Sequence, residues 1–215
     1  YSHFMEKEIM EQVDSSLRDI SLGGRVLSND CVKLGGLEMH DKELIDLEHL
    51  ILLGGGTSYH AGLLGVEYCK ELSEFQSVQI VDGADFDIKD VPKTGITGVI
   101  LLSQSGETKD LHRCIQIARR NNLFLIGVVN VVDSLIAREV DCGVYLNAGR
   151  EVGVASTKSF TSQVIILSLM AIWFAQKRNV NSNKRRQYIR DLRNLHVHIE
   201  NILQKYYQNM TEYIS

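Results

Sequence analysis

Three short segments of the 215-residue sequence combine glycine with small hydroxyl side chains. Glycine lets a backbone turn tightly and approach a ligand closely, and serine and threonine hydroxyls donate hydrogen bonds to anionic oxygens. Where such a segment leads into a helix, the first N–H groups of the helix lie unpaired at the positive end of its dipole. The pattern indicates binding of a phosphate group. The segments are 54–58 (GGGTS), 103–108 (SQSGET) and 153–158 (GVASTK).

The residues around these segments alternate between short apolar runs and helical spacing. Apolar runs bounded by glycine and polar residues predict buried strands at 50–53, 78–81, 98–102, 123–129 and 142–146. Helical spacing predicts helices at 58–72, 107–121, 134–139 and 156–176. Such alternation predicts an α/β fold with a doubly wound parallel sheet. Ligands of these sheets bind beyond the carboxyl ends of the strands, so we expect the three segments to meet at that edge.

Further helical patterns flank the predicted sheet. Residues 3–20 and 41–47 are predicted helices before the first strand. Residues 183–208 predict an amphipathic helix, which either leads toward a further domain or folds back on the sheet. Its apolar stripe consists of Leu192, Leu195, Ile199, Ile202 and Leu203. We expect one domain over residues 1–180 and a separate helical segment over 181–215.

Other binding motifs fail on inspection. The P-loop pattern is absent, and the dinucleotide pattern that begins at Gly54 fails at Tyr59. A nucleophile elbow around Ser105 lacks both flanking glycines. His196 and His198 are two residues apart and point to different helix faces, and the four cysteines do not cluster. We therefore expect no metal site and no cofactor.

Composition narrows the class of protein. Hydrophobic residues make up 44% and the formal net charge is −4, as in an ordinary globular protein. The one dense basic run, 184–186, falls in a helical pattern and predicts a solvated face, so no nucleic-acid partner is expected. The most apolar stretch, 164–174, is shorter than the ~20 residues that span a membrane. Scattered cysteines favour reduced thiols and a cytoplasmic location.

Each hydroxyl-rich segment also has a simpler explanation. Serine and threonine are common N-caps, which accept a hydrogen bond from the first turn of a helix. The occurrence of all three segments at one sheet edge favours a ligand instead. The candidate caps are Thr57 and Ser58 in the first segment, Ser105 and Thr108 with Glu107 in the second, and Ser156 and Thr157 in the third.

The longer motifs around these segments resemble a known family. GTSYHAG at 56–62, LSQSGETKD at 102–110 and NAGREVGVASTKSFTSQ at 147–163 resemble the first sugar-isomerase (SIS) domain of the glutamine–fructose-6-phosphate aminotransferases. The opening YSHFMEKEIMEQ resembles the segment where the isomerase half of those enzymes follows the glutaminase half. The resemblance implies a three-layer αβα sandwich of the flavodoxin-like type with a five-stranded parallel sheet. It also implies that residues 181–215 lead toward a second SIS domain.

The resemblance implies substrate-binding residues as well. The family makes glucosamine 6-phosphate from fructose 6-phosphate and glutamine, at the start of UDP-N-acetylglucosamine synthesis. The second motif would hold the phosphate, and the first and third motifs would line the sugar. By position these residues are Ser103, Gln104, Ser105 and Thr108 for the phosphate, and Thr57, Ser58, Val154 and Ser156 for the sugar.

The family's catalytic groups have no matching positions in this sequence. The base glutamate, the ring-opening histidine, the imine-forming lysine and the glutaminase cysteine lie in other parts of those enzymes. We therefore expect no catalytic residue here, an inactive fragment when the chain is alone, and a homo-oligomer formed through SIS domains. The alternatives are a non-catalytic SIS module that senses a sugar phosphate and a domain that only dimerises.

Two positions depart from the family pattern. Gly55 stands where the family usually has cysteine, and Asp133 stands where the family often has glycine. The second departure places a feedback site for a nucleotide sugar in doubt.

Overall fold

The computed structural model describes residues 1, 3–20 and 24–208, and five strands in these ranges form one parallel sheet. The strand order is β2-β1-β3-β4-β5, the flavodoxin-like order. The α/β prediction with a five-stranded parallel sheet is therefore confirmed. The strands are β1 (His49–Gly54), β2 (Ser77–Asp82), β3 (Thr97–Ser103), β4 (Phe124–Val129) and β5 (Cys142–Tyr145).

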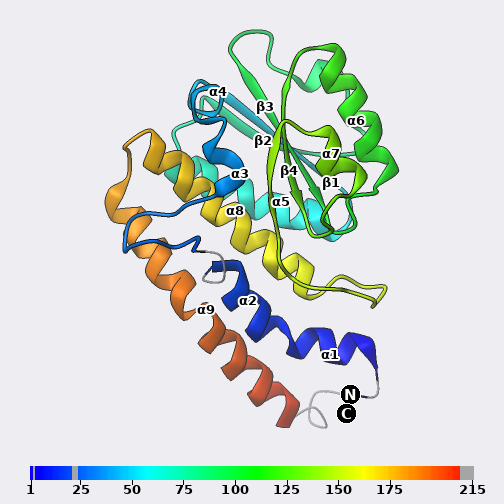
Figure 1. Ribbon diagram of the computed structural model, residues 1–215, viewed down its shortest axis with the longest axis vertical. Coiled ribbons are helices and arrows are strands. Elements are labelled where there is room, and N and C mark those ends of the chain that lie inside the picture. Colours follow the sequence, from blue (N-terminus) through cyan, green and yellow to red (C-terminus); the bar gives the residue numbers. More distant parts are fainter. Residues whose placement is uncertain (2, 21–23, 209–215) are drawn as a thin grey trace.

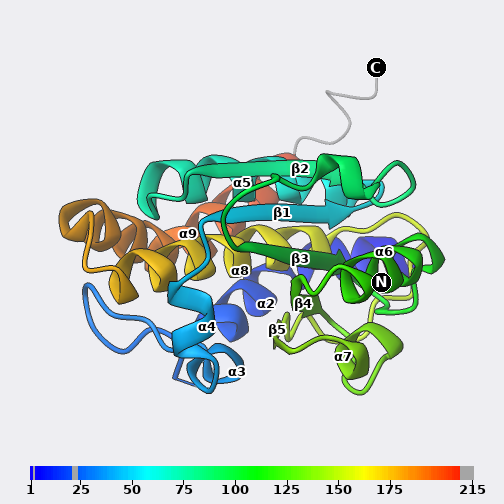
Figure 2. The same cartoon turned by 90° about the horizontal axis from the view of Figure 1, so that it is seen from above.

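Helices cover both faces of the sheet, which makes three layers (Figures 1 and 2). On one face lie α5 (Thr57–Leu72) and α8 (Lys158–Lys177), and on the other lie α6 (Lys109–Arg120) and α7 (Leu135–Glu139). Alternate residues of each strand contribute to the two cores. In β1, Leu52 packs in the core with α5 and α8, whereas Leu53 packs in the core with α6. Burial on both faces explains why the strands appear as continuous apolar runs.

Helix α8 is the central helix of the larger core. It begins at Lys158, two residues after the predicted start, and its length and composition would allow it to cross a membrane. However, 78% of its apolar window is buried inside the protein, as in the core helix of a globular domain. The helix extends beyond the apolar run 164–174, and the polar residues Ser159, Ser162 and Gln163 before this run are buried as well.

The N-terminal helical pattern resolves into two helices. Helix α1 (Phe4–Met10) is followed by α2 (Gln12–Ile20), with a break at Glu11. Two short helices, α3 (Gly35–Glu38) and α4 (Asp41–Ile45), precede β1, and a 3₁₀ turn, η1 (Ile88–Asp90), follows β2. Neither α3 nor η1 was predicted.

Helix α9 (Ser182–Gln208) packs on α2 and α8 over its first half (Figure 1). Ile189 is fully buried and Leu192 is 9% exposed, whereas Ile202 near its end is 56% exposed. The apolar stripe is therefore covered only in part. The division at residues 180 and 181 and the lead toward a second domain stay predictions, and residues 209–215 lie outside the described part of the chain.

Candidate functional site

The candidate site lies where the strand order reverses. Strands β1 and β3 are neighbours, but α5 leaves β1 toward one face of the sheet and α6 leaves β3 toward the other. Diverging connections open a crevice at the carboxyl ends of two such strands. Figure 2 shows these two ends side by side. Segments 54–58 and 103–108 are thus brought to one edge, as predicted.

The loop after β3 is closed by its own side chains. Ser103 is 2% exposed, and its Oγ accepts a hydrogen bond from Gly106 N at 2.9 Å. The Ser103 and Thr108 hydroxyls are also hydrogen-bonded, at 2.9 Å. Ser105 Oγ accepts from Glu107 N at 3.1 Å. Gly106 has a φ of +70°, and a Cβ at this position would lie 2.0 Å from the Ser134 hydroxyl, so only glycine fits. Hydrogen bonds within residues 103–108 therefore hold the shape of this loop.

The N-terminus of α6 is open to an anion. Thr108 occupies the N-cap position of α6, but its hydroxyl bonds to Ser103 instead of the helix. Glu107 does not cap α6 either, since its Oε1 accepts from Leu135 N of α7 at 2.8 Å. Within the described ranges, no N-cap side chain is bonded to the first turn of α6. The capping explanation is therefore wrong for the second segment, and the first N–H groups of α6 keep their capacity for a phosphate oxygen.

The N-terminus of α5 also lacks a capping side chain, like that of α6. Its N-cap residue is Gly56, which has no side chain, and no N-cap hydrogen bond from a side chain occurs there in the described structure. Thr57, the first residue of α5, is exposed. Ser58 is 9% exposed, and its Oγ accepts from Gln163 Nε2 of α8 at 2.9 Å. Two open helix N-termini with hydroxyls beside them thus flank the point where the strand order reverses.

The N-terminus of α8 differs, because a carboxylate already occupies it. Glu151 Oε1 accepts from Thr157 N at 3.0 Å and from Ser159 N at 3.2 Å. The Thr157 hydroxyl also donates to this oxygen at 3.4 Å. The cap predicted from Ser156 or Thr157 is therefore wrong: the side chain of Glu151 caps this helix.

The third segment lies on a loop that extends from β5 toward α1 (Figure 1). Val154 is fully exposed and Ser156 is partly exposed. Hydrogen bonds join this loop to α1, α2, Asn130 and the end of β4. Gln104 is also partly exposed, in the loop after β3. The roles of the eight predicted contact residues in binding stay predictions.

Sequence reasoning missed several polar groups that shape this region. Glu8, Glu151 and Gln163 position the loops, but each looks like an ordinary surface residue in the sequence. Asp19 of α2 is fully buried, and this burial raises the pKa of its carboxyl to about 7, against the opposing effects of the Ser162 hydroxyl and the nearby arginines. Among the described residues, no group of three His, Cys, Asp or Glu side chains could hold a metal ion.

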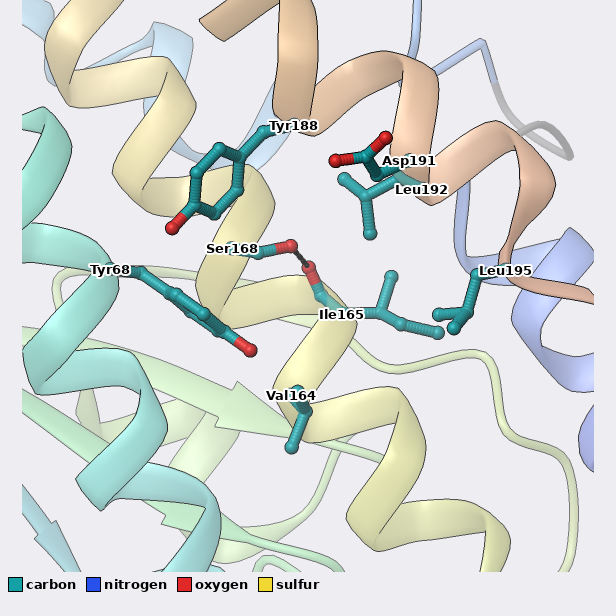
Figure 3. Close-up of a pocket in the computed structure, with 8 residues that line it drawn as sticks. All are labelled: Tyr68, Val164, Ile165, Ser168, Tyr188, Asp191, Leu192 and Leu195. Atoms are coloured by element: carbon teal, nitrogen blue, oxygen red, sulfur yellow. Dashed lines mark hydrogen bonds between the residues drawn. The ribbon is translucent and has the colours of Figure 1, made fainter. Parts of the chain in front are cut away.

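A separate pocket of about 250 Å³ lies between α5, α8 and α9 (Figure 3). Its lining is mostly apolar, and the one charged side chain is Asp191. The Ser168 hydroxyl is occupied by a hydrogen bond to the Ile165 carbonyl at 2.7 Å. An anionic sugar would gain little here, because the one charged group of the lining is a carboxylate, which repels a phosphate. The pocket is lined by Tyr68, Val164, Ile165, Ser168, Tyr188, Asp191, Leu192 and Leu195.

Comparison with known families decides what this architecture is. The family model described as SIS domain matches residues 43–173, more than half of the chain. The chain belongs to the SIS domain family. The match begins in α4, includes all five strands and ends in α8, so it contains both open helix N-termini.

The SIS domain is of the type found in glutamine–fructose-6-phosphate aminotransferases. It is 45% identical over 172 residues to a protein of Acanthamoeba polyphaga mimivirus named "Probable glutamine–fructose-6-phosphate aminotransferase", covering 80% of this chain and 28% of that protein. It is 39% identical over 204 residues to the human glutamine–fructose-6-phosphate aminotransferase 2, covering 94% of this chain and 30% of that protein. The chain thus spans less than a third of the length of these relatives.

A solved structure supports the same assignment. The C-terminal domain of glucosamine-fructose-6-phosphate aminotransferase from Francisella tularensis superimposes with a TM-score of 0.79 at 26% identity. The match covers 92% of this chain and 54% of that chain. The SIS domain described here therefore corresponds to about half of that solved domain.

Proposed function

We propose that this SIS domain binds the phosphate and part of the sugar of fructose 6-phosphate or glucosamine 6-phosphate within a glutamine–fructose-6-phosphate aminotransferase. The observation that carries the proposal is the pair of open helix N-termini beside β1 and β3. A phosphate between them would accept hydrogen bonds from the first N–H groups of α5 and α6. These donors are neutral, so the site suits an acidic protein and needs no Lys or Arg.

The hydroxyls around the crevice have separate parts in this proposal. Ser105 and Thr108 lie in the loop whose shape is already fixed by Ser103 and Gly106. Their hydroxyls can turn toward a phosphate oxygen, as can the exposed Thr57. Gln104 offers an amide donor from the same loop. Preformed donors lose little freedom when a ligand binds, which favours affinity.

The amino transfer and the isomerisation need further groups. A base, a ring-opening acid and an amine that forms an imine are expected from other parts of the enzyme. The role proposed for this domain is to hold the phosphate end of the sugar while those groups act on the other end. Fixed placement of the phosphate would orient the reacting carbons.

The test is removal of single hydroxyls. Ser105→Ala and Thr108→Ala are each expected to weaken binding of fructose 6-phosphate, measured by titration calorimetry. A hydrogen bond to a charged group contributes about 1.5–3 kcal/mol, which corresponds to roughly ten-fold or more in affinity. Ser28→Ala is the matched control, because its hydroxyl bonds to Asp30 in a distant turn. Wild-type affinity in both site variants would refute the proposal.

A further inference from the structure

The loop that carries the third segment is held by a carboxylate from the first helix of the chain. Glu8 of α1 is 2% exposed. Its Oε1 accepts from Val152 N at 2.6 Å and from Gly153 N at 3.2 Å, and its Oε2 accepts from Gly153 N at 3.1 Å. Glu8 and Val152 are 144 residues apart in the sequence. A single side chain thus bonds two successive backbone amides of the loop.

The burial pattern of α1 shows that these bonds are an important attachment of the helix. Glu8 is the most deeply buried residue of α1, whereas Ile9 and Met10 are half-buried and Phe4 and Met5 are 62% and 45% exposed. A helix attached only for stability normally buries an apolar stripe. Burial of a carboxylate is costly unless its oxygens are hydrogen-bonded, and here the loop amides supply those bonds. Helix α1 therefore docks on this loop through a polar contact.

The loop is shaped to receive this carboxylate. A Cβ at position 153 would lie 2.6 Å from Glu8 Oε2, so the close approach requires Gly153. One helical turn after Glu8, Glu11 accepts from the buried Lys158 at 2.6 Å, where the loop enters α8. Arg18 of α2 donates to the carbonyls at the start of the loop, those of Asn147 and Ala148, at 3.2 Å each. The N-terminal helices thus fix the beginning, middle and end of the loop.

We propose that Glu8 is a positioning residue that sets the affinity of this domain for the sugar part of its ligand, and not for the phosphate. The inference rests on the proposed function. Val154 follows the clamped amide of Gly153 directly, and Ser156 lies two residues further on. The phosphate loop, by contrast, is closed by bonds within residues 103–108 and to α7. Asn130 joins the two loops, since its N–H donates to the Gln104 carbonyl and its side chain bonds to residues 148 and 149, but it does so ahead of the amides that Glu8 holds. Releasing Glu8 would free the middle of the loop that carries Val154 and Ser156, while Arg18 and Glu11 still hold its two ends. The phosphate loop would stay in place.

The experiment compares two ligands that share the phosphate. Binding of glucosamine 6-phosphate and of inorganic phosphate is measured by NMR titration of the amide signals, with Gly106 as reporter of the phosphate loop. Glu8→Ala is expected to weaken glucosamine 6-phosphate binding about ten-fold or more and to change phosphate binding by less than about two-fold. Glu8→Gln keeps the shape and one acceptor oxygen, so it should give a smaller loss. Asp14→Ala, an exposed acidic residue of α2, is the matched control.

The outcomes are distinct. Unchanged glucosamine 6-phosphate affinity in Glu8→Ala would overturn the inference. An equal loss of affinity for glucosamine 6-phosphate and for inorganic phosphate would also overturn it, because it indicates a general structural role. If Glu8→Ala does not fold, the same comparison is made with Glu8→Gln. Failure of the wild-type chain to bind either ligand would instead refute the proposed function.

Discussion

Two neighbouring glycines at the start of α5 should respond in opposite ways to the same substitution. Gly56 has φ +55° and ψ −128°, a conformation that side chains of L-residues strongly disfavour. Gly55 lies outside the left-handed region, and a Cβ there would meet no described atom within 4 Å. Both residues are exposed, so burial does not distinguish them. The contrast therefore isolates backbone conformation.

The magnitudes follow from the two conformations. Gly55→Ala reduces the freedom of the unfolded chain, which stabilises a protein by about 0.4–1 kcal/mol where no strain results. Gly56→Ala forces a side chain into a sparsely populated conformation, which costs about 1–3 kcal/mol. In a chain of this size, each kcal/mol shifts Tm by roughly 2–4 °C. We expect Gly55→Ala to raise Tm by about 1–3 °C and Gly56→Ala to lower it by about 5 °C.

Thermal unfolding followed by circular dichroism measures both shifts, and calorimetry with fructose 6-phosphate measures the effect on binding. Gly56→Ala should weaken binding, because the turn sets the direction of the first N–H groups of α5. Gly55→Cys, which matches the residue common in the family, should leave affinity within a few-fold. A fall in Tm for Gly55→Ala as large as that for Gly56→Ala would refute the reasoning. A hundred-fold loss of binding in Gly55→Cys would show that the pocket needs free space at this position.

Two further predictions concern pH and catalysis. The pKa of the Asp19 carboxyl is raised to about 7 from the ordinary 3.8. The contribution of Asp19 to the free energy of unfolding is therefore complete below about pH 4 and is lost as the pH rises to about 7. Asp19→Asn should therefore raise the free energy of unfolding at pH 8 by up to about 4 kcal/mol, with little change at pH 4. Urea titrations at the two pH values measure this difference, and an equal effect at both would contradict the prediction. The isolated chain should form no glucosamine 6-phosphate from fructose 6-phosphate with glutamine or ammonia, and enzymatic turnover in a coupled assay would show that catalytic groups are present.

The sheet could be predicted from the sequence because its strands are buried on both faces. Residues 50–53 are all apolar, and the structure places alternate members in the two cores. Helix α3 could not be predicted, because it contains Gly35 and Gly36, which disfavour helices. It forms because it packs on the edge strand β5, where a Cβ at position 36 would lie 2.0 Å from the Gly143 carbonyl oxygen. This contact is a tertiary effect that local sequence does not reveal.

The candidate site also has parts that could be predicted from the sequence and parts that could not. The places of segments 54–58 and 103–108 could be predicted, because parallel strands end at one edge of a sheet. The hydrogen-bond partners of their hydroxyls could not be predicted, since Thr108 bonds to Ser103 only after the loop has closed. Glu151 caps α8 from six residues before Thr157, a distance that sequence rules for capping do not consider. Glu8 looks like part of a solvated helix until α1 meets a loop 144 residues away.

The contact between α1 and the loop after β5 also has a consequence for folding. In the loop after β3, the bond between Ser103 and Thr108 joins residues only five positions apart, so this part of the loop can form together with its strand. The amides of Val152 and Gly153 become protected only when α1 meets a loop 144 residues away, which carries a larger loop-closure entropy. Because α1 deeply buries only Glu8 and none of its apolar side chains, we expect that it can detach while the sheet stays folded. In native-state hydrogen exchange, these two amides should open at a lower free energy than the amide of Gly106.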